Sequence, residues 1–179
     1  MKELVLVKLG GSLITNKCIK EKARTDMIAR LASEIRSTLK YKRLIVAHGG
    51  GSFPHYPAKK YRVNDGITNK DSLKGFCLTN DSAARLNRIV VGTFIKKGIN
   101  AMSLQPSAFI MCTNGKIENL DVKIIKFALK KGLLVVPYGD AVLDRTKGIT
   151  IVSTEQLLAE LAVRLNAKRI VVAGIVDGV

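Results

Sequence analysis

Short β-branched runs alternate with longer amphipathic stretches along the chain, and two of these runs end directly at glycines. The run 4–9 (LVLVKL) ends at Gly10-Gly11, and the run 44–47 (LIVA) ends at a histidine and three glycines. Between them, residues 23–40 repeat apolar side chains at helical spacing. This order favours a parallel or mixed sheet covered by helices on both faces. Ligands of such sheets bind beyond the carboxyl ends of the strands, where both glycine groups fall.

The rest of the chain continues the alternation, and its 179 residues predict a single domain over 1–179. The Asn114-Gly115 pair predicts a turn. The further predicted elements are helices at 80–97, 124–130 and 154–165, strands at 101–104, 109–112, 133–137 and 170–173, and a hairpin of 142–144 with 149–152.

The chain is strongly basic, with 30 Lys and Arg against 14 Asp and Glu, a formal net charge of +16. Such an excess suits an anionic partner: nucleic acid, phosphorylated small molecules or an acidic membrane surface. A solvated basic exterior explains it equally well. The basic residues are scattered, aromatic residues are only 5%, and there is no Trp, so the basic-aromatic stripe that stacks bases is missing. Charge alone therefore does not favour nucleic acid as a partner.

The chain shows no membrane or export signal. No apolar run approaches the ~18 residues of a spanning helix, and residues 1–10 lack the apolar stretch of a signal peptide. The three cysteines are widely spaced, and no pair has metal-ligand spacing. These features predict a cytoplasmic protein with no membrane partner and no metal held by cysteines.

The first glycine motif is Lys8-Leu9-Gly10-Gly11-Ser12. The two glycines allow backbone N–H groups to approach an anion. Lys8 can place its charge over transferring phosphate oxygens, and Lys17 lies in the same loop. By itself this motif is also a common turn, and it does not fit the P-loop pattern.

The second motif is HGGGSFPH, residues 48–55. Three successive glycines cost more conformational entropy than a tight turn requires. They predict a phosphate-binding loop that leads into a helix N-terminus. We expect His48, at the end of a strand, to point into the fold, and His55 to donate a hydrogen bond to a bound anion.

Both motifs, KLGGSLITNK at 8–17 and HGGGSFPHYPAKKY at 48–61, resemble those of the amino acid kinase superfamily, in particular its archaeal isopentenyl phosphate kinase family. The resemblance covers the whole chain in order, up to Val176-Asp177-Gly178-Val179. It implies an α/β fold, a three-layer αβα sandwich of the carbamate kinase-like type. It also implies ATP-dependent phosphorylation of isopentenyl phosphate to isopentenyl diphosphate, with Mg²⁺, by a homodimer. Because the chain stops just after a predicted strand, we expect a truncated nucleotide-binding part.

The resemblance also implies roles for single residues, and a structural or lysine-orienting role for Asp140. The implied catalytic residues are Lys8, Lys17 and His55. The residues implied to bind ATP are Lys8, Gly10, Gly11, Ser12, Gly51 and Asp177, and those implied to bind the acceptor are Gly50, His55, Phe76 and Thr154.

The chain departs from the family pattern at four places. A proline replaces a glycine and removes an N–H beside the acceptor phosphate. The departures are Pro54, Tyr56-Pro57, Thr154 in place of a glycine, and Gly174-Ile175 in place of Thr-Asp. They leave two alternatives open: a related kinase with a phosphonate acceptor, like the fosfomycin kinases, or a non-catalytic member that binds without transfer.

Overall fold

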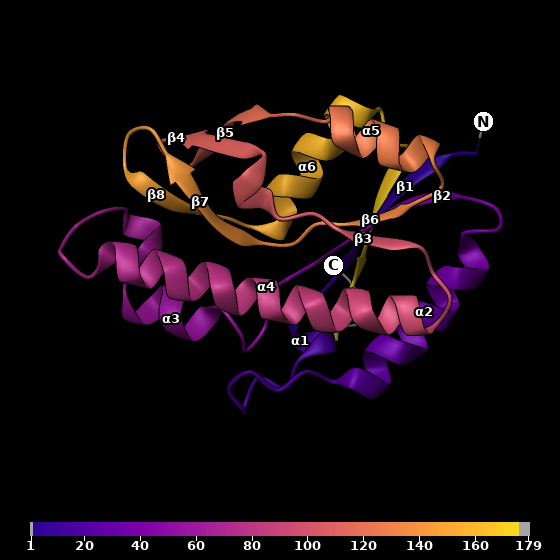
Figure 1. The fold of residues 1–179 in the computed structure, drawn as a ribbon, viewed down its shortest axis with the longest axis horizontal. Helices are drawn as coiled ribbons and strands as arrows, with labels where there is room; N and C mark the ends of the chain where they lie inside the picture. The colour runs from indigo at the N-terminus through magenta and orange to yellow at the C-terminus, as the bar shows by residue number, and fades with distance from the viewer. Residues whose placement is uncertain (1, 176–179) are drawn as a thin grey trace.

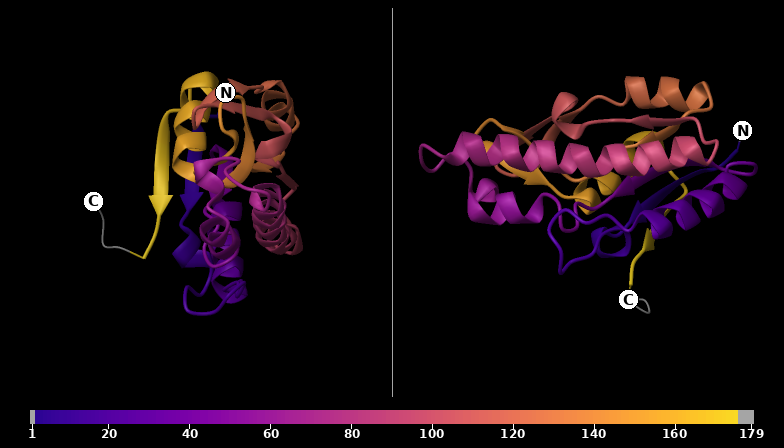
Figure 2. Two further views of the ribbon diagram at one scale, coloured as in Figure 1. Left: turned by 90° about the vertical axis from the view of Figure 1, so that its left-hand side faces the viewer. Right: turned by 60° about the horizontal axis from the view of Figure 1, so that its bottom comes forward.

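The computed structural model describes residues 2–175, and five parallel strands form its central sheet in the order β3-β6-β2-β1-β9 (Figure 1). This arrangement confirms the predicted α/β fold. The edge strand β9 carries largely exposed side chains and stands at the margin of the molecule (Figure 2). The strands of this sheet are β1 (Leu4–Leu9), β2 (Arg43–His48), β3 (Ala101–Ser103), β6 (Leu134–Val136) and β9 (Arg169–Ala173).

Helices cover both faces of the sheet, as predicted. The helices α2 and α4 pack on one face, and α5 and α6 pack on the other (Figure 1). Among the described residues, no helix has both the length and the apolarity to cross a membrane. The helices are α1 (Gly11–Ile14), α2 (Thr25–Thr38), α3 (His55–Lys60), α4 (Ser72–Lys96), α5 (Lys123–Lys130) and α6 (Thr154–Leu165), with 3-10 turns at Val63–Asp65 and Pro106–Ala108.

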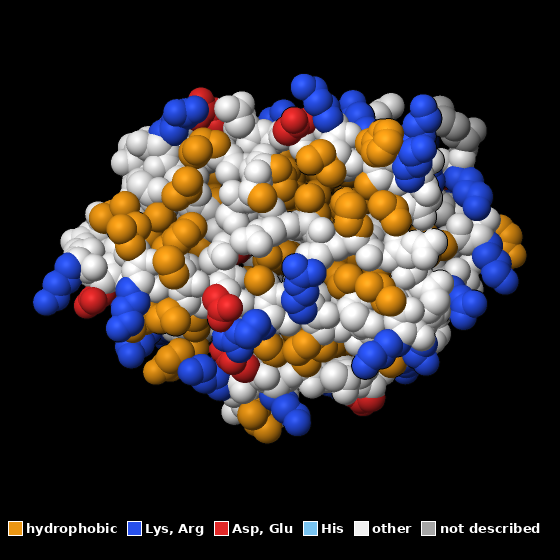
Figure 3. Space-filling model, viewed as in Figure 1, with side chains coloured by type: hydrophobic (Ala, Val, Ile, Leu, Met, Phe, Trp, Pro, Cys, Tyr) orange, Lys and Arg blue, Asp and Glu red, His pale blue; other side chains and the backbone are white. Residues whose placement is uncertain are grey.

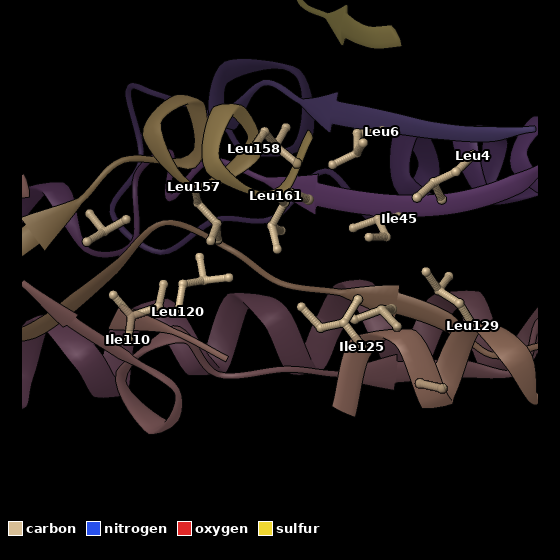
Figure 4. Packing of buried hydrophobic residues seen from close by; sticks show 14 of the residues in the cluster. Leu4, Leu6, Ile45, Ile110, Leu120, Ile125, Leu129, Leu157, Leu158 and Leu161 are labelled. Atoms are coloured by element: carbon tan, nitrogen blue, oxygen red, sulfur yellow. The ribbon is translucent and has the colours of Figure 1, made fainter. Parts of the chain in front are cut away.

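Successive strand residues face opposite sides of a sheet, so β1 and β2 supply two separate cores. Leu6 and Ile45 pack with α5 and α6, whereas Val5 and Val46 pack with α2 and α4. Figure 4 shows the first core, in which the leucines of α6 fill the space between the central sheet and the segments beneath it. Two cores on opposite faces make the three-layer sandwich.

A second, four-stranded sheet lies beside α6 and was not predicted as a separate sheet (Figure 1). The predicted hairpin is confirmed, and so is the turn, where Asn114 and Gly115 both have positive φ. The strand after that turn was missed because its sequence, KIENL, is mostly polar. The sheet has the order β5-β4-β7-β8 and consists of β4 (Ile110–Thr113), β5 (Lys116–Leu120), β7 (Asp140–Asp144) and β8 (Gly148–Val152).

Helix α4 begins at Ser72, well before the predicted start at residue 80. Gly75 made the earlier part a poor helix by propensity. In the structure, a Cβ at this position would lie 2.2 Å from the Cβ of Tyr61, so only glycine permits the close approach. Tertiary packing against Tyr61 therefore explains why a glycine, which has a low helix propensity, stands inside this helix.

Asp144 ties together the two hairpins of the second sheet. Its Oδ1 accepts hydrogen bonds from the backbone N–H groups of Asn114 (3.2 Å), Thr146 (2.9 Å) and Lys147 (2.8 Å), and its Oδ2 accepts one from Gly115 (2.7 Å). Burial favours the neutral acid, but these donors outweigh it and hold the pKa of Asp144 below its ordinary value.

Replacing Asp144 with Asn should lower the free energy of unfolding by about 1–3 kcal/mol at pH 7, because the amide has one acceptor oxygen for four donors. A carboxylate with a lowered pKa contributes stability that is present above its unfolded pKa and lost as the pH falls through its folded pKa. The difference should therefore shrink in urea titrations at acid pH. The exposed Asp26→Asn change is the control, and a gap that stays constant with pH would contradict the assignment.

Candidate phosphate-binding site

The two glycine motifs meet at the carboxyl ends of β1 and β2, which are hydrogen-bonded neighbours in register. A Cβ on Gly11 would lie 2.4 Å from the backbone nitrogen of Gly51, and a Cβ on Gly49 would lie 3.0 Å from that of Gly11. Gly51 also has a φ of +54°, which favours glycine. The two loops thus pack backbone against backbone, and no larger residue fits at these positions.

A buried threonine clamps the two loops together. The hydroxyl of Thr15 donates to the carbonyl oxygen of Gly11 (2.7 Å) and accepts from the N–H of Ser52 (3.0 Å). The Ser52 hydroxyl oxygen is also buried, and it has no hydrogen-bond partner among the described residues. The clamp fixes the first loop against the second without using the N–H groups at the start of α1.

The first glycine loop leads directly into a helix, but the second does not. Helix α1 begins at Gly11, and the first N–H groups of a helix have no acceptor within it. After the second loop, α3 begins only at His55 and is six residues long. The expected helix N-terminus at the second loop is therefore separated from the glycines by the turn from Gly50 to Phe53.

Lys8 extends from β1 toward α6, where its ammonium group forms an ion pair with Glu155. The Lys8 side chain is largely buried, at 14% exposed, while that of Glu155 is 65% exposed. Burial opposes ionisation of Glu155, but the Lys8 hydrogen bond overcomes it and lowers its pKa. The sequence analysis gave Glu155 no role, and the pairing joins residues 147 positions apart.

Lys17 and His55 are both exposed. Along the chain, Lys17 comes well before the second glycine loop and His55 directly after it. The Cδ2 atom of His55 lies 3.7 Å from the point where a Cβ on Gly50 would stand. The Pro54 ring covers the same glycine, since its Cγ lies 2.2 Å from that point. The His55 ring therefore lies beside Gly50 of the second glycine loop.

His48 points into the fold, as predicted. It is 1% exposed and stacks on the Tyr138 ring, with 5.6 Å between centroids. The side-chain amide of Asn87 donates to Nε2 (3.1 Å), which leaves the proton on Nδ1 to donate to the Gly49 carbonyl (3.2 Å). Burial lowers the pKa of His48 to about 4, so the ring is neutral at pH 7.

Because His48 has a pKa near 6.5 when unfolded, the unfolded chain binds more protons between pH 6.5 and about 4. Stability should therefore fall as the pH drops through this window, by up to about 3 kcal/mol. The His48→Gln variant should lack this part of the pH dependence. Urea unfolding at pH 7 and pH 5 measures it, and the exposed His55→Gln variant should behave like the unmodified chain. Parallel pH profiles for His48→Gln and the unmodified chain would contradict a buried neutral ring.

Two other predicted residues have mainly internal contacts. Thr154 is buried, and its hydroxyl donates to the carbonyl oxygen of His48 (2.9 Å). Phe76 is half-buried on α4 and packs against the small cluster formed by Val63, Ala141 and Ile149. The predicted cofactor residue Asp177 lies outside the described residues.

Asp140 contacts no lysine among the described residues; the carboxylate that pairs with Lys8 is that of Glu155. Burial raises the pKa of Asp140 to about 6, although N–H donors oppose the shift. The carboxylate accepts from Asn80 (3.1 Å), Ser107 (3.2 Å) and Ala141 (2.9 Å). It joins α4 to the second sheet. Of the two roles that the resemblance implied for Asp140, structural or lysine-orienting, these contacts fit the structural one.

Basic side chains are spread over the surface. Figure 3 shows them around the rim of one face, separated by apolar and uncharged patches and not gathered in a stripe. Among residues 2–175, no three His, Cys, Asp or Glu side chains come together as a metal site.

The fold and the paired glycine loops define a class of protein. The model of the amino acid kinase family matches residues 3–179, and the chain belongs to this family. It is therefore a kinase, a phosphotransferase that uses ATP. Within this family, the relatives that are most similar among those compared below are isopentenyl phosphate kinases.

The isopentenyl phosphate kinase of Methanothermobacter thermautotrophicus is 38% identical over 183 residues, which cover 98% of this chain and 68% of that protein. The isopentenyl phosphate kinase of Methanocaldococcus jannaschii is 36% identical, with coverages of 98% and 70%. A solved isopentenyl phosphate kinase superposes with a TM-score of 0.92 at 38% identity and covers 99% of this chain and 74% of its own. An aspartate kinase from Synechocystis, at 16% identity and a TM-score of 0.72, shares the fold.

Proposed function

We propose that this chain transfers the γ-phosphoryl group of ATP to the phosphate of isopentenyl phosphate and forms isopentenyl diphosphate. The observation that carries the proposal is the direct packing of the two glycine loops at the ends of neighbouring strands, with Lys8 beside them. The likeness to isopentenyl phosphate kinases over nearly the whole chain supports the choice of acceptor.

The chemistry asks the protein for alignment of the two substrates and for positive charge that neutralises the phosphate oxygens. An oxygen of the acceptor phosphate attacks the γ-phosphorus, the bond to the β,γ-bridging oxygen breaks, and ADP leaves. Two anions must approach each other, so positive groups at the point of transfer stabilise the transition state. In our proposal Lys8 and Lys17 supply these charges, and Gly11 and Ser12 offer N–H groups to the ATP phosphates. The N–H of Gly10 donates to the Ala173 carbonyl oxygen (2.8 Å), so Gly10 contributes the close approach of its backbone and not a donor.

The acceptor phosphate is placed beside Gly50 and Gly51, within reach of His55. The His55 ring lies against Gly50, so a ring N–H can donate to a phosphate held there. Phe76 marks the wall for the apolar tail, and Thr154 takes part through its backbone, because its hydroxyl is occupied by His48.

Several further parts of the proposal rest on the resemblance: a homodimer, a cytoplasmic location, and one domain over 1–179 with Asp177 on the nucleotide side. Magnesium usually keeps several waters and binds substrate phosphates with few carboxylates, which fits a site lacking a cluster of acids among residues 2–175. When bound, the ion would neutralise charge on the ATP phosphates.

The first test is the reaction itself. ADP release is measured with ATP and, separately, isopentenyl phosphate, a phosphonate such as fosfomycin, or no acceptor. We expect release that depends on isopentenyl phosphate, together with isopentenyl diphosphate as product. Release with the phosphonate alone would favour the related-kinase alternative, and binding of ATP without transfer to either acceptor would favour the non-catalytic one.

Replacing Lys8 or Lys17 with Ala should lower kcat by about 10²-fold, the scale of losing one charged contact to the transition state. Neither change should reduce Tm greatly, because Lys17 is exposed and Glu155 remains largely solvated when Lys8 is removed. Lys126→Ala, on the exposed side of α5, is the matched control. Near-normal kcat in both variants would remove the two lysines from the mechanism.

Replacing His55 with Ala should lower kcat/KM for isopentenyl phosphate by about 10²-fold or more, because a donor to the acceptor phosphate is lost. His55→Gln keeps a neutral donor at similar reach and should retain more activity. Both variants should melt like the unmodified chain, since the ring is exposed. Full activity in His55→Ala, or a loss confined to Tm, would make this histidine structural and would remove the acceptor assignment.

A further inference from the structure

The segment that carries Lys17 folds back on itself between α1 and α2. A bridge pairs Thr15 with Ala23, and the N–H of Asn16 donates to the carbonyl oxygen of Lys22 (2.8 Å). We call residues 15–23 the Lys17 loop. At its turn, Glu21 has a φ of +53°, an uncommon conformation for a residue with a side chain. Such a conformation is kept only where surrounding contacts hold it.

Glu21 supplies contacts in two directions. Its backbone N–H donates to the carbonyl oxygen of Ser52, in the second glycine loop (3.2 Å). Its carboxylate reaches α4, where it accepts from the Ser82 hydroxyl (3.0 Å) and from both terminal nitrogens of Arg85, with 2.8 Å to Nη2. One residue therefore links the Lys17 loop, the glycine loop and the longest helix.

We propose that Glu21 is a positioning residue, which, through Arg85 and Ser82, holds the Lys17 loop in place over the glycine loop for phosphoryl transfer. This inference rests on the proposed function, in which Lys17 acts on the transferring group. A bidentate arginine–carboxylate pair fixes direction as well as distance, unlike an ordinary surface ion pair.

Charge on the loop explains why the anchor is a carboxylate. The Lys17 loop carries Lys17, Lys20 and Lys22, and Glu21 is its one acidic residue. Without Glu21, the loop would carry three lysines and no acidic residue, and Arg85 would lose its partner in the loop. The Arg85 hydrogen bond, the largest influence, keeps the pKa of Glu21 below its ordinary value, so the anchor is ionised at pH 7.

A second contact supports the same loop from the other side. The Lys20 ammonium lies over the Tyr56 ring, 4.7 Å from its centroid, and Tyr56 follows His55 on α3. The cation–π contact is exposed and weak compared with the bidentate pair. The Lys17 loop is thus tied to α4 through Glu21 and, more weakly, to α3 through Lys20.

The test compares Glu21→Ala, Glu21→Gln and Arg85→Ala with the control Asp81→Asn. Asp81 is the other partner of Arg85, one turn earlier on α4, and does not touch the loop. We expect kcat to fall by about ten- to a hundredfold in Glu21→Ala and Arg85→Ala, the scale of a small misplacement of a catalytic group. Glu21→Gln, which keeps one acceptor oxygen, should recover part of the loss, and Asp81→Asn should retain kcat. Tm should change little throughout, because all these side chains are partly exposed.

Amide hydrogen exchange of residues 16–22 gives a readout that does not depend on catalysis. We expect faster exchange in Glu21→Ala and Arg85→Ala, and unchanged exchange in Asp81→Asn. Unchanged exchange in the two anchor variants, or faster exchange with full kcat, would overturn the inference. If the unmodified chain fails to transfer phosphate to any acceptor, the proposed function fails on its own, and the positioning role falls with it even where exchange confirms the anchor.

Discussion

The close approach of two backbones, at Gly11 and Gly51, is the constraint on which the site depends. A side chain at either position would collide with the opposite loop. The approach requires β1 and β2 to be neighbours in register, because only then do both loops leave the sheet at one point. It also requires the Thr15 clamp, which satisfies one polar group of each loop. The strand order, the glycines and the Thr15 hydrogen bonds therefore act together to bring the two loops into contact.

Charge at this site is ordered rather than merely abundant. The net charge of +16 gives a basic exterior, but that excess is dispersed over the surface (Figure 3). Lys8 is held in one direction by Glu155, and the Lys17 loop is held by Glu21. Glu155 remains partly solvated, so it orients Lys8 without cancelling the lysine's charge completely. Ordered cations of this kind need little reorganisation when a phosphoryl group moves.

Local patterns in the sequence predicted most elements of the fold. The helix at Thr154–Leu165 was predicted with its observed bounds, because Ser153 caps it and leucines repeat on one face. The strand at Lys116–Leu120 was missed, since its alternation carries few apolar residues. The early start of α4 was missed because the contact of Gly75 with Tyr61 is tertiary. Local sequence patterns reflect interactions between residues that are close in the chain. The two exceptions depend on contacts between elements that meet only in the folded structure.

The candidate site divides in the same way. The glycines, Lys8 and His55 stand in compact motifs and were identified from the sequence. Glu155 and Glu21 were not, because their partners lie 147 and 64 positions away in the chain. No local spacing marks such a pair. A residue that holds a distant side chain in place is thus harder to find from the sequence than a residue in a compact motif.

Two departures from the family pattern are accommodated inside the fold. Pro54 is buried at the start of α3, where the N–H that proline lacks would have no helical acceptor, and its φ of −78° suits the ring. Thr154 turns its hydroxyl to the His48 carbonyl. Both larger side chains therefore find contacts within the fold: the Pro54 ring packs against Gly50, and Thr154 binds the backbone at the start of the same loop.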